Sequence, residues 1–128
     1  RAQPTQPGLT SRQKVKQMKP TIVYPDFDKL DLRVGKVVTA SAPAWSEKLL
    51  EFGVDLGPEI GEKVILSAIK AWYAPEEFIG KHYVFIVNLV ERKMGGGVSQ
   101  GMMIMADGQP RPQPFAVPEE ITPGTVVR

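Results

Sequence analysis

The sequence predicts an all-β fold, a small barrel of five main strands with one short helix between the third and the fourth. Two observations support this class. Apolar runs of strand length recur along the 128 residues, and glycine or proline bounds most of them. These runs do not alternate with long amphipathic segments, so the sequence does not favour a doubly wound parallel sheet.

The first strand covers residues 32–38, after a short helical turn at residues 26–30 for which Asp26 is the expected cap. The apolar positions of this strand change phase at Gly35. A glycine inside a strand pattern indicates a bulge or a tight bend. Such a bend is what a small barrel needs in order to curl and close.

The middle of the chain supplies two strands and the helix. Residues 50–56 alternate apolar with polar or small side chains, which predicts a strand with one buried face. Residues 63–69 are apolar at all but two positions, so this third strand is expected to be covered on both sides. The helix is predicted at residues 74–80, because Pro75 stands near its first position and Gly80 at its end.

Strands four and five cover residues 83–89 and 102–106, and a short strand at 115–117 and a closing edge at 121–128 follow. Five strands with a helix between the third and the fourth is the order of the Greek-key barrel called the OB-fold. Barrels of this kind bind oligonucleotides on one sheet face and on the flanking loops.

The charge distribution predicts two parts, a flexible basic tail or linker at residues 1–20 and one domain at residues 21–128. The tail carries five basic and no acidic groups, whereas the rest of the chain carries 11 basic and 14 acidic groups. An anion-binding surface on the domain therefore has to be a local patch of cations.

The composition also excludes several classes of protein. No cysteine is present, which removes disulfides, thiolate catalysis and sulfur-ligated zinc and fits a reducing compartment. The only histidine, His82, begins an apolar run and is expected at a strand end. We therefore expect no enzyme activity in this chain, no cofactor and no metal. No apolar run approaches the length of a membrane span, so no membrane partner is expected.

Residues 84–106 carry the strongest functional signal. Arg92 and Lys93 begin the polar connection between two apolar strands, and a glycine run at residues 95–97 follows them. Basic side chains followed by flexible backbone suit a surface that meets phosphate and ribose. The run lacks the spacing and the lysine of a P-loop, so a flexible hairpin loop is its alternative interpretation.

Arg33 and Lys36 are expected to join Arg92 and Lys93 in one basic patch, because the first strand and the hairpin after the fourth can lie close together in such a barrel. The alternative is a scattered, solvated set of charges. Trp72 and Tyr73 follow the third strand. They suit base stacking, a dimer contact or the core.

Five motifs occur in order and without large gaps over residues 24–128. They are DFxxLDLRVGKV at 26–37, EKLL leading to VDLG at 47–57, YxPEEFIGK at 73–81, VNLxxRKM at 87–94 and SxGM at 99–102. Together they resemble the tRNA-binding domain that is appended to many bacterial methionyl-tRNA synthetases. The same domain occurs as a stand-alone bacterial tRNA-binding protein and in the endothelial monocyte-activating polypeptide family.

The resemblance implies an OB-fold and a non-catalytic domain that binds the general shape of tRNA, in a homodimer and in the cytoplasm. By position, Ser99 and Met102 match an element associated with tRNA contact, and Arg92 and Lys93 match the basic pair ahead of it. The tRNA-binding residues expected from the residue pattern and the resemblance together are Arg33, Lys36, Asn88, Arg92, Lys93, Ser99 and Met102.

We therefore expect a tRNA-binding module, attached to an aminoacyl-tRNA synthetase of the methionyl type, that raises the affinity of the enzyme for tRNA. The main alternative is a peptide-binding dimer of the same fold, similar to a secretion chaperone. A domain that serves dimerisation alone is a further alternative.

Overall fold

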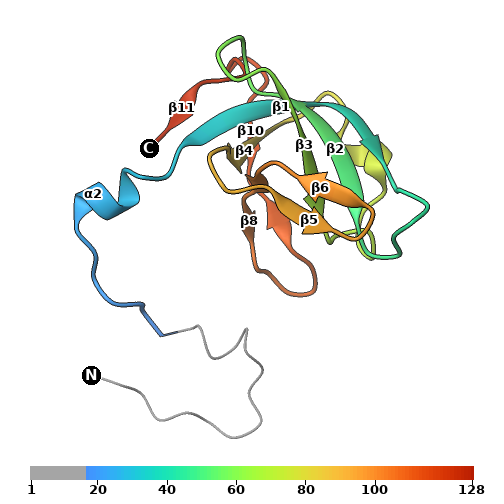
Figure 1. Ribbon diagram of the computed structural model, residues 1–128, viewed down its shortest axis with the longest axis horizontal. Coiled ribbons are helices and arrows are strands. Elements are labelled where there is room, and N and C mark those ends of the chain that lie inside the picture. The colour runs from blue at the N-terminus through green and yellow to red at the C-terminus, as the bar shows by residue number, and fades with distance from the viewer. Residues whose placement is uncertain (1–16) are drawn as a thin grey trace, which may run out of the picture.

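The computed structural model describes residues 17–128 and shows a barrel-like β-sheet with little helix (Figure 1). The main path of the sheet is antiparallel and runs through five strands. In spatial order these are β10 (Ala116–Val117), β4 (His82–Ile86), β1 (Leu32–Ser41), β2 (Leu50–Asp55) and β3 (Glu62–Ser67). The predicted all-β class is confirmed. Most of the predicted basic tail, residues 1–16, lies outside the described residues.

Further short elements complete the chain. Two helical turns are α2 (Tyr24–Phe27) and the 3₁₀ helix η1 (Pro75–Phe78), the latter between the third and fourth strands as predicted. The short strands are β5 (Arg92–Met94), β6 (Gly97–Ser99), β7 (Met102–Met103), β8 (Met105–Ala106), β9 (Gln113–Pro114) and β11 (Val126–Val127). The predicted fifth strand is thus divided into β7 and β8, which pair with β4 and β9 respectively.

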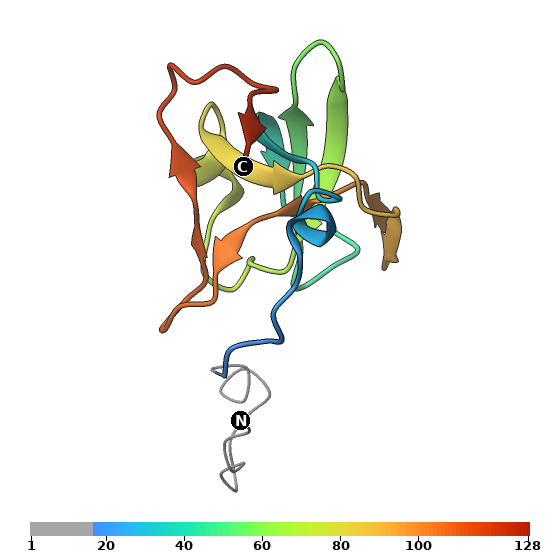
Figure 2. The same ribbon diagram turned by 90° about the vertical axis from the view of Figure 1, so that its left-hand side faces the viewer.

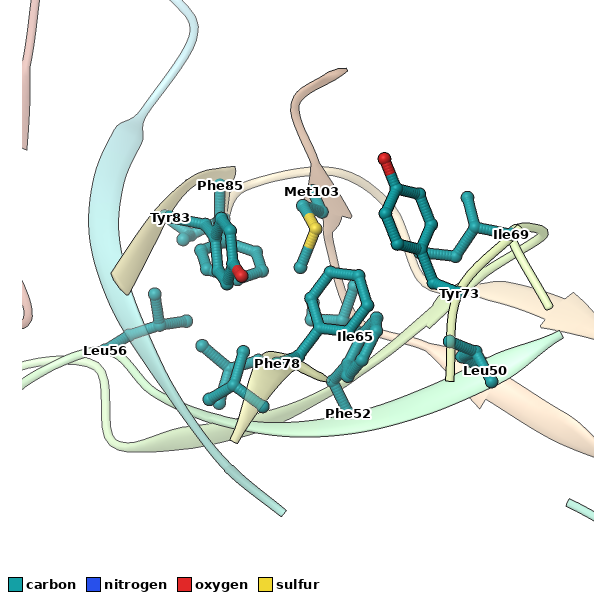
Figure 3. Close-up of a cluster of buried hydrophobic side chains, with 13 residues drawn as sticks. Leu50, Phe52, Leu56, Ile65, Ile69, Tyr73, Phe78, Tyr83, Phe85 and Met103 are labelled. Atoms are coloured by element: carbon teal, nitrogen blue, oxygen red, sulfur yellow. The ribbon is translucent and has the colours of Figure 1, made fainter. Parts of the chain in front are cut away.

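The core fills the inside of the barrel with aromatic and branched side chains (Figure 3). Phe78 of η1 lies at its centre, and its ring centroid is 4.8 Å from Phe52, 5.4 Å from Tyr73 and 5.5 Å from Tyr83. The alternation predicted for residues 50–56 is confirmed, because every second residue of β2 is buried. η1 therefore closes one part of the barrel with a single large side chain.

Glycine is required at position 35 by close packing of the core, and not by the bulge or bend that the sequence predicted there. A Cβ at this position would lie 2.6 Å from Val54, 2.8 Å from Leu56 and 2.8 Å from Phe85, so the core packs directly against its backbone. The bulge of β1 lies instead between Val37 and Thr39, where the register with β2 shifts.

The expected cap of the first helical turn is also wrong. Val23 occupies the N-cap of α2 and makes no side-chain cap, whereas Asp26 lies inside the turn and pairs with Lys29 at 3.8 Å. All residues from 17 to 30 are exposed, and the segment up to α2 extends away from the barrel (Figure 2).

The barrel closes through the segment after β6, which lies beside β3. The backbone N–H of Gln100 donates to the carbonyl oxygen of Val64 at 2.8 Å, and the side-chain Oε1 of Gln100 accepts from the N–H of Val64 at 2.9 Å. β7 then pairs with β4, which completes the ring. None of the helices among residues 17–128 is long and apolar enough to cross a membrane.

Candidate functional site

The β5–β6 hairpin projects beside the barrel (Figure 2) and packs over the outer side of β3. Ile65 and Leu66 of β3 are both buried, which confirms that this strand is covered on its two faces. Beneath the hairpin, a Cβ added at Gly97 would lie 3.3 Å from Leu66. A flexible hairpin loop was the alternative interpretation of the glycine run, but the pairing of residues 92–94 with 97–99 as strands was not predicted, because the glycines give no apolar alternation.

A surface hollow of about 330 Å³ lies between this hairpin and the loop 42–49, which joins β1 to β2. We call it the basic hollow. Its lining residues are Trp45, Ser46, Lys48, Leu49, Ala68, Arg92, Lys93, Met94 and Gly95. Three of them are cations with exposed side chains, and none is a carboxylate. The hollow therefore favours an anion.

The loop 42–49 is held in shape by Ser46. Its Oγ accepts from the backbone N–H of Lys48 at 3.2 Å and from that of Leu49 at 3.1 Å. Its carbonyl oxygen lies 3.5 Å from the Nζ of Lys70, and the N–H of Lys70 donates to the carbonyl oxygen of Lys48 at 3.1 Å. Lys70 thus adds a fourth cation beside the hollow.

Trp45 lies across the glycine run. A Cβ added at Gly95, Gly96 or Gly97 would come within 2.9 Å of an atom of the indole ring in each case. The three glycines are therefore a flat backbone surface on which one face of the ring rests. The phosphate cradle considered for this run is replaced by an aromatic contact.

The structure brings Arg92 and Lys93 together at the basic hollow, and it places Arg33 and Lys36 on β1, outside the lining. The side chain of Arg33 is 17% exposed and forms ion pairs with two carboxylates of the protein. Its Nε lies 2.6 Å from Asp31, and its Nη1 lies 3.4 Å from Glu59. The hydrogen bond to Asp31 raises the pKa of Arg33 above its ordinary value.

Lys36 is exposed at the middle of β1, where it pairs in register with Asp55 and His82. His82 is buried, and its Nδ1 lies 2.9 Å from the carbonyl oxygen of Ile121. This ring ties the C-terminal segment to β4. Among residues 17–128, no group of three or more His, Cys, Asp or Glu side chains suits a metal ion.

Asn88, Ser99 and Met102 have three different surroundings. The side chain of Asn88 accepts from the N–H of Asp31 at 2.8 Å and donates to the carbonyl oxygen of Lys29 at 2.7 Å, so it fixes the segment before β1. Ser99 is 4% exposed. Met102 is 47% exposed on β7 and is open to a partner.

The Oγ of Ser99 accepts from the N–H of Leu66 at 3.0 Å and donates to the carbonyl oxygen of Gly101 at 2.9 Å. This hydroxyl therefore helps to close the barrel between β3 and the hairpin. Trp72 is 42% exposed, whereas Tyr73 is in the core and donates its hydroxyl to the carbonyl oxygen of Pro112 at 2.6 Å.

Sequence reasoning missed Trp45, Lys48 and Lys70. A signal was available, because the loops between strands one and two and between strands four and five flank the binding face of an OB-fold. Trp45 and Lys48 lie in the first of these loops. Lys70 follows β3, and nothing in the sequence indicates its contact with Ser46.

Residues 32–126 match the family model described as a putative tRNA binding domain. Among curated relatives, a methionine–tRNA ligase of Clostridium acetobutylicum is 40% identical over 122 residues, which cover 94% of this chain and 19% of the ligase. The chain spans a fifth or less of the length of the curated methionine–tRNA ligases that it matches.

Two solved structures are similar over most of the chain. A MetRS-related protein from Pyrococcus horikoshii has a TM-score of 0.80 and 33% identity, and the match covers 86% of this chain and 100% of that protein. The chaperone CsaA of Bacillus anthracis has a TM-score of 0.74 and 25% identity, with coverage of 85% and 100%.

Proposed function

The chain belongs to the tRNA-binding domain family, and we propose that it grips tRNA at the basic hollow by contacts to the phosphate backbone. The family match confirms the predicted tRNA-binding domain, which is a binding module and not a catalytic one. The single observation that carries the placement of the contact is the lining of the hollow, with three cations and no carboxylate.

The physical argument follows from the charge of RNA. A protein that reads RNA by shape contacts phosphates and 2′-hydroxyl groups, because the base edges of an A-form helix lie in a deep groove. Arg92 and Lys93 come from the hairpin and Lys48 comes from the loop 42–49, so cations approach the ligand from two sides. We further assign the barrel, with its β1–β2 and β4–β7 connections flanking the hollow, to the OB-fold.

The other predicted contact residues are proposed in different roles. Lys36 and Met102 are exposed and able to touch a tRNA that extends beyond the hollow. Arg33, Asn88 and Ser99 are engaged with protein atoms, so we propose that they shape the tRNA-binding surface mainly by holding its parts in place.

A homodimer and an attached synthetase domain complete the proposal, which places the protein in the cytoplasm. Exposed large apolar side chains precede β1, namely Met18, Ile22, Val23, Tyr24, Phe27 and Leu30. A second copy would cover such a surface.

Attachment to a methionyl-type synthetase is supported by the similarity to methionine–tRNA ligases and would raise tRNA affinity through effective concentration.

An electrophoretic titration with unfractionated tRNA at several salt concentrations tests the proposal. If the three lining cations each neutralise one phosphate, log K should fall with log salt at a slope of roughly −2 to −3. The double substitution Arg92→Ala with Lys93→Ala should weaken binding at low salt and reduce the slope to about −1.

The matched control removes the same charge elsewhere. Lys81 and Arg128 are exposed and do not line the hollow, so Lys81→Ala with Arg128→Ala should leave the affinity and the slope close to the original. Equal effects of the two double variants would show that binding depends on total charge and would contradict the assigned contact.

The second candidate function, a peptide-binding dimer, is favoured by the similarity to the chaperone CsaA and by the exposed apolar segment before β1. The test is whether the protein still retains an unfolded polypeptide at about 0.5 M salt. Contacts to phosphate are strongly weakened at such a salt concentration, so retention would not depend on them. Polypeptide binding without tRNA binding would favour this candidate.

A further inference from the structure

One face of Trp45 is covered and the other is open. The glycine run supports the ring from one side, as the close approach of all three added Cβ atoms shows. The residue nevertheless exposes 43% of its surface. A flat ring with one covered face and this exposure presents its second face to solvent.

The support of the ring is rigid on both sides of the contact. The loop that carries Trp45 is fixed by the two hydrogen bonds to the Oγ of Ser46. The glycines lie at the turn of a paired hairpin, where Gly95 has a φ of +62°. An aromatic side chain that is already positioned loses little conformational freedom when a ligand stacks on it.

The chemistry around the ring suits a nucleotide. An indole face stacks any nucleobase, and the phosphates on either side of that base need cations. Lys48 follows Trp45 by three residues, and Arg92 and Lys93 line the same hollow. The volume of about 330 Å³ is at the lower end of small-ligand pockets, a size suited to one nucleotide.

We propose that Trp45, supported on one face by the glycine run, stacks one unpaired nucleobase of a bound RNA on its open face, while Lys48, Arg92 and Lys93 hold the phosphates beside it. This inference rests on the proposed function and adds to it a preference for RNA that offers an unstacked base. The three charges of the lining have one sign, which favours a polyanion such as RNA as the ligand.

The test uses the full chain with Trp72→Phe, which leaves Trp45 as its single tryptophan because the sequence has two. The probes are a single-stranded RNA of about six nucleotides, within the site size of an OB-fold, and a fully paired RNA duplex. Single-stranded RNA is expected to quench the emission of Trp45, and the duplex is expected to leave it nearly unchanged.

Substitutions of the ring give the second readout. Trp45→Leu should weaken binding of single-stranded RNA by about 5- to 100-fold and leave duplex binding unchanged, whereas Trp45→Phe should retain most of the affinity. In Gly96→Ala the ring stays in the chain, but the new Cβ would lie 2.9 Å from the indole, so the ring must move and the affinity should fall. Melting curves establish that each variant is folded.

The outcomes separate this inference from the proposed function. Failure of the wild-type chain to bind tRNA in a salt-dependent manner would overturn both. Salt-dependent tRNA binding that needs Arg92 and Lys93, with equal single-strand affinities for folded Trp45→Leu and the parent, would overturn the stacking alone. Quenching of Trp45 by an unfolded polypeptide and not by RNA would also overturn it.

Discussion

The Nε of Arg33 lies 2.6 Å from the Oδ1 of Asp31, its neighbour two residues earlier in the chain. Side chains two residues apart along extended backbone point to the same side, so this ion pair forms between near neighbours in the sequence. The Nη1 of Arg33 also donates to the carbonyl oxygen of Gly124 at 3.1 Å. A cation that was predicted to meet tRNA thus ties β1 to the segment before β11.

Arg33→Met should therefore act on stability more than on tRNA affinity. The change removes the hydrogen bond to Gly124 and leaves a half-exposed carboxylate behind, at an expected cost of about 1–2 kcal/mol in the free energy of unfolding. Urea unfolding measures this cost, and a tRNA titration on the same samples should show a much smaller loss of affinity than Arg92→Ala causes. A loss of affinity as large as that of Arg92→Ala would show that Arg33 contacts the RNA directly.

Ser99→Ala should weaken the closure of the barrel. The substitution leaves the buried N–H of Leu66 without its hydroxyl partner, which costs about 1–3 kcal/mol. Thermal or urea unfolding checks the loss, and Ser41→Ala, at an exposed position of β1, is the matched control. Equal stability of Ser99→Ala and the control would contradict the structural role of this hydroxyl.

The main elements could be predicted from local patterns. The alternation in β2 and the proline and acidic residues of η1 act within a few residues of the chain, and both were placed correctly. The apolar run of β3 also indicated correctly that both faces are covered. What covers the outer face, the β5–β6 hairpin, could not be inferred, because its pairing depends on glycines that fit many conformations.

The candidate site was predictable only in part. Arg92 and Lys93 stand out by charge and position, and the structure places both at the hollow. The burial of Ser99 and the position of Trp45 depend on contacts between segments more than 30 residues apart, which a sequence pattern does not encode. The pairing of Arg33 with Asp31, in contrast, was within reach of the two-residue period of a strand.

Gly35→Ala should destabilise the barrel by crowding its core. The new methyl group would meet Val54 at 2.6 Å and two further core side chains at 2.8 Å. Such overpacking costs typically about 1–3 kcal/mol. In a double-mutant cycle, Val54→Ala makes room, so the combined loss should be smaller than the sum of the two single losses by about 0.5–3 kcal/mol. Simple additivity in urea unfolding would rule out this contact as the cause.

Tyr83 should make the protein lose stability in alkaline solution. Its side chain is buried in the core, and this burial, with smaller contributions from Glu77 and Tyr73, raises its pKa above the ordinary value of 10.0. Above that value the unfolded chain releases the phenolic proton while the folded chain still holds it. The free energy of unfolding therefore falls as the pH rises from the unfolded-state pKa toward the folded-state pKa, and the contribution is fully present below this window.

Tyr83→Phe should make the pH dependence in this window shallower, whereas Tyr24→Phe, at a residue that is 64% exposed, should leave it in place. Urea unfolding of the three proteins across the alkaline range measures the slopes, and an equal fall in all three would remove Tyr83 as the group responsible.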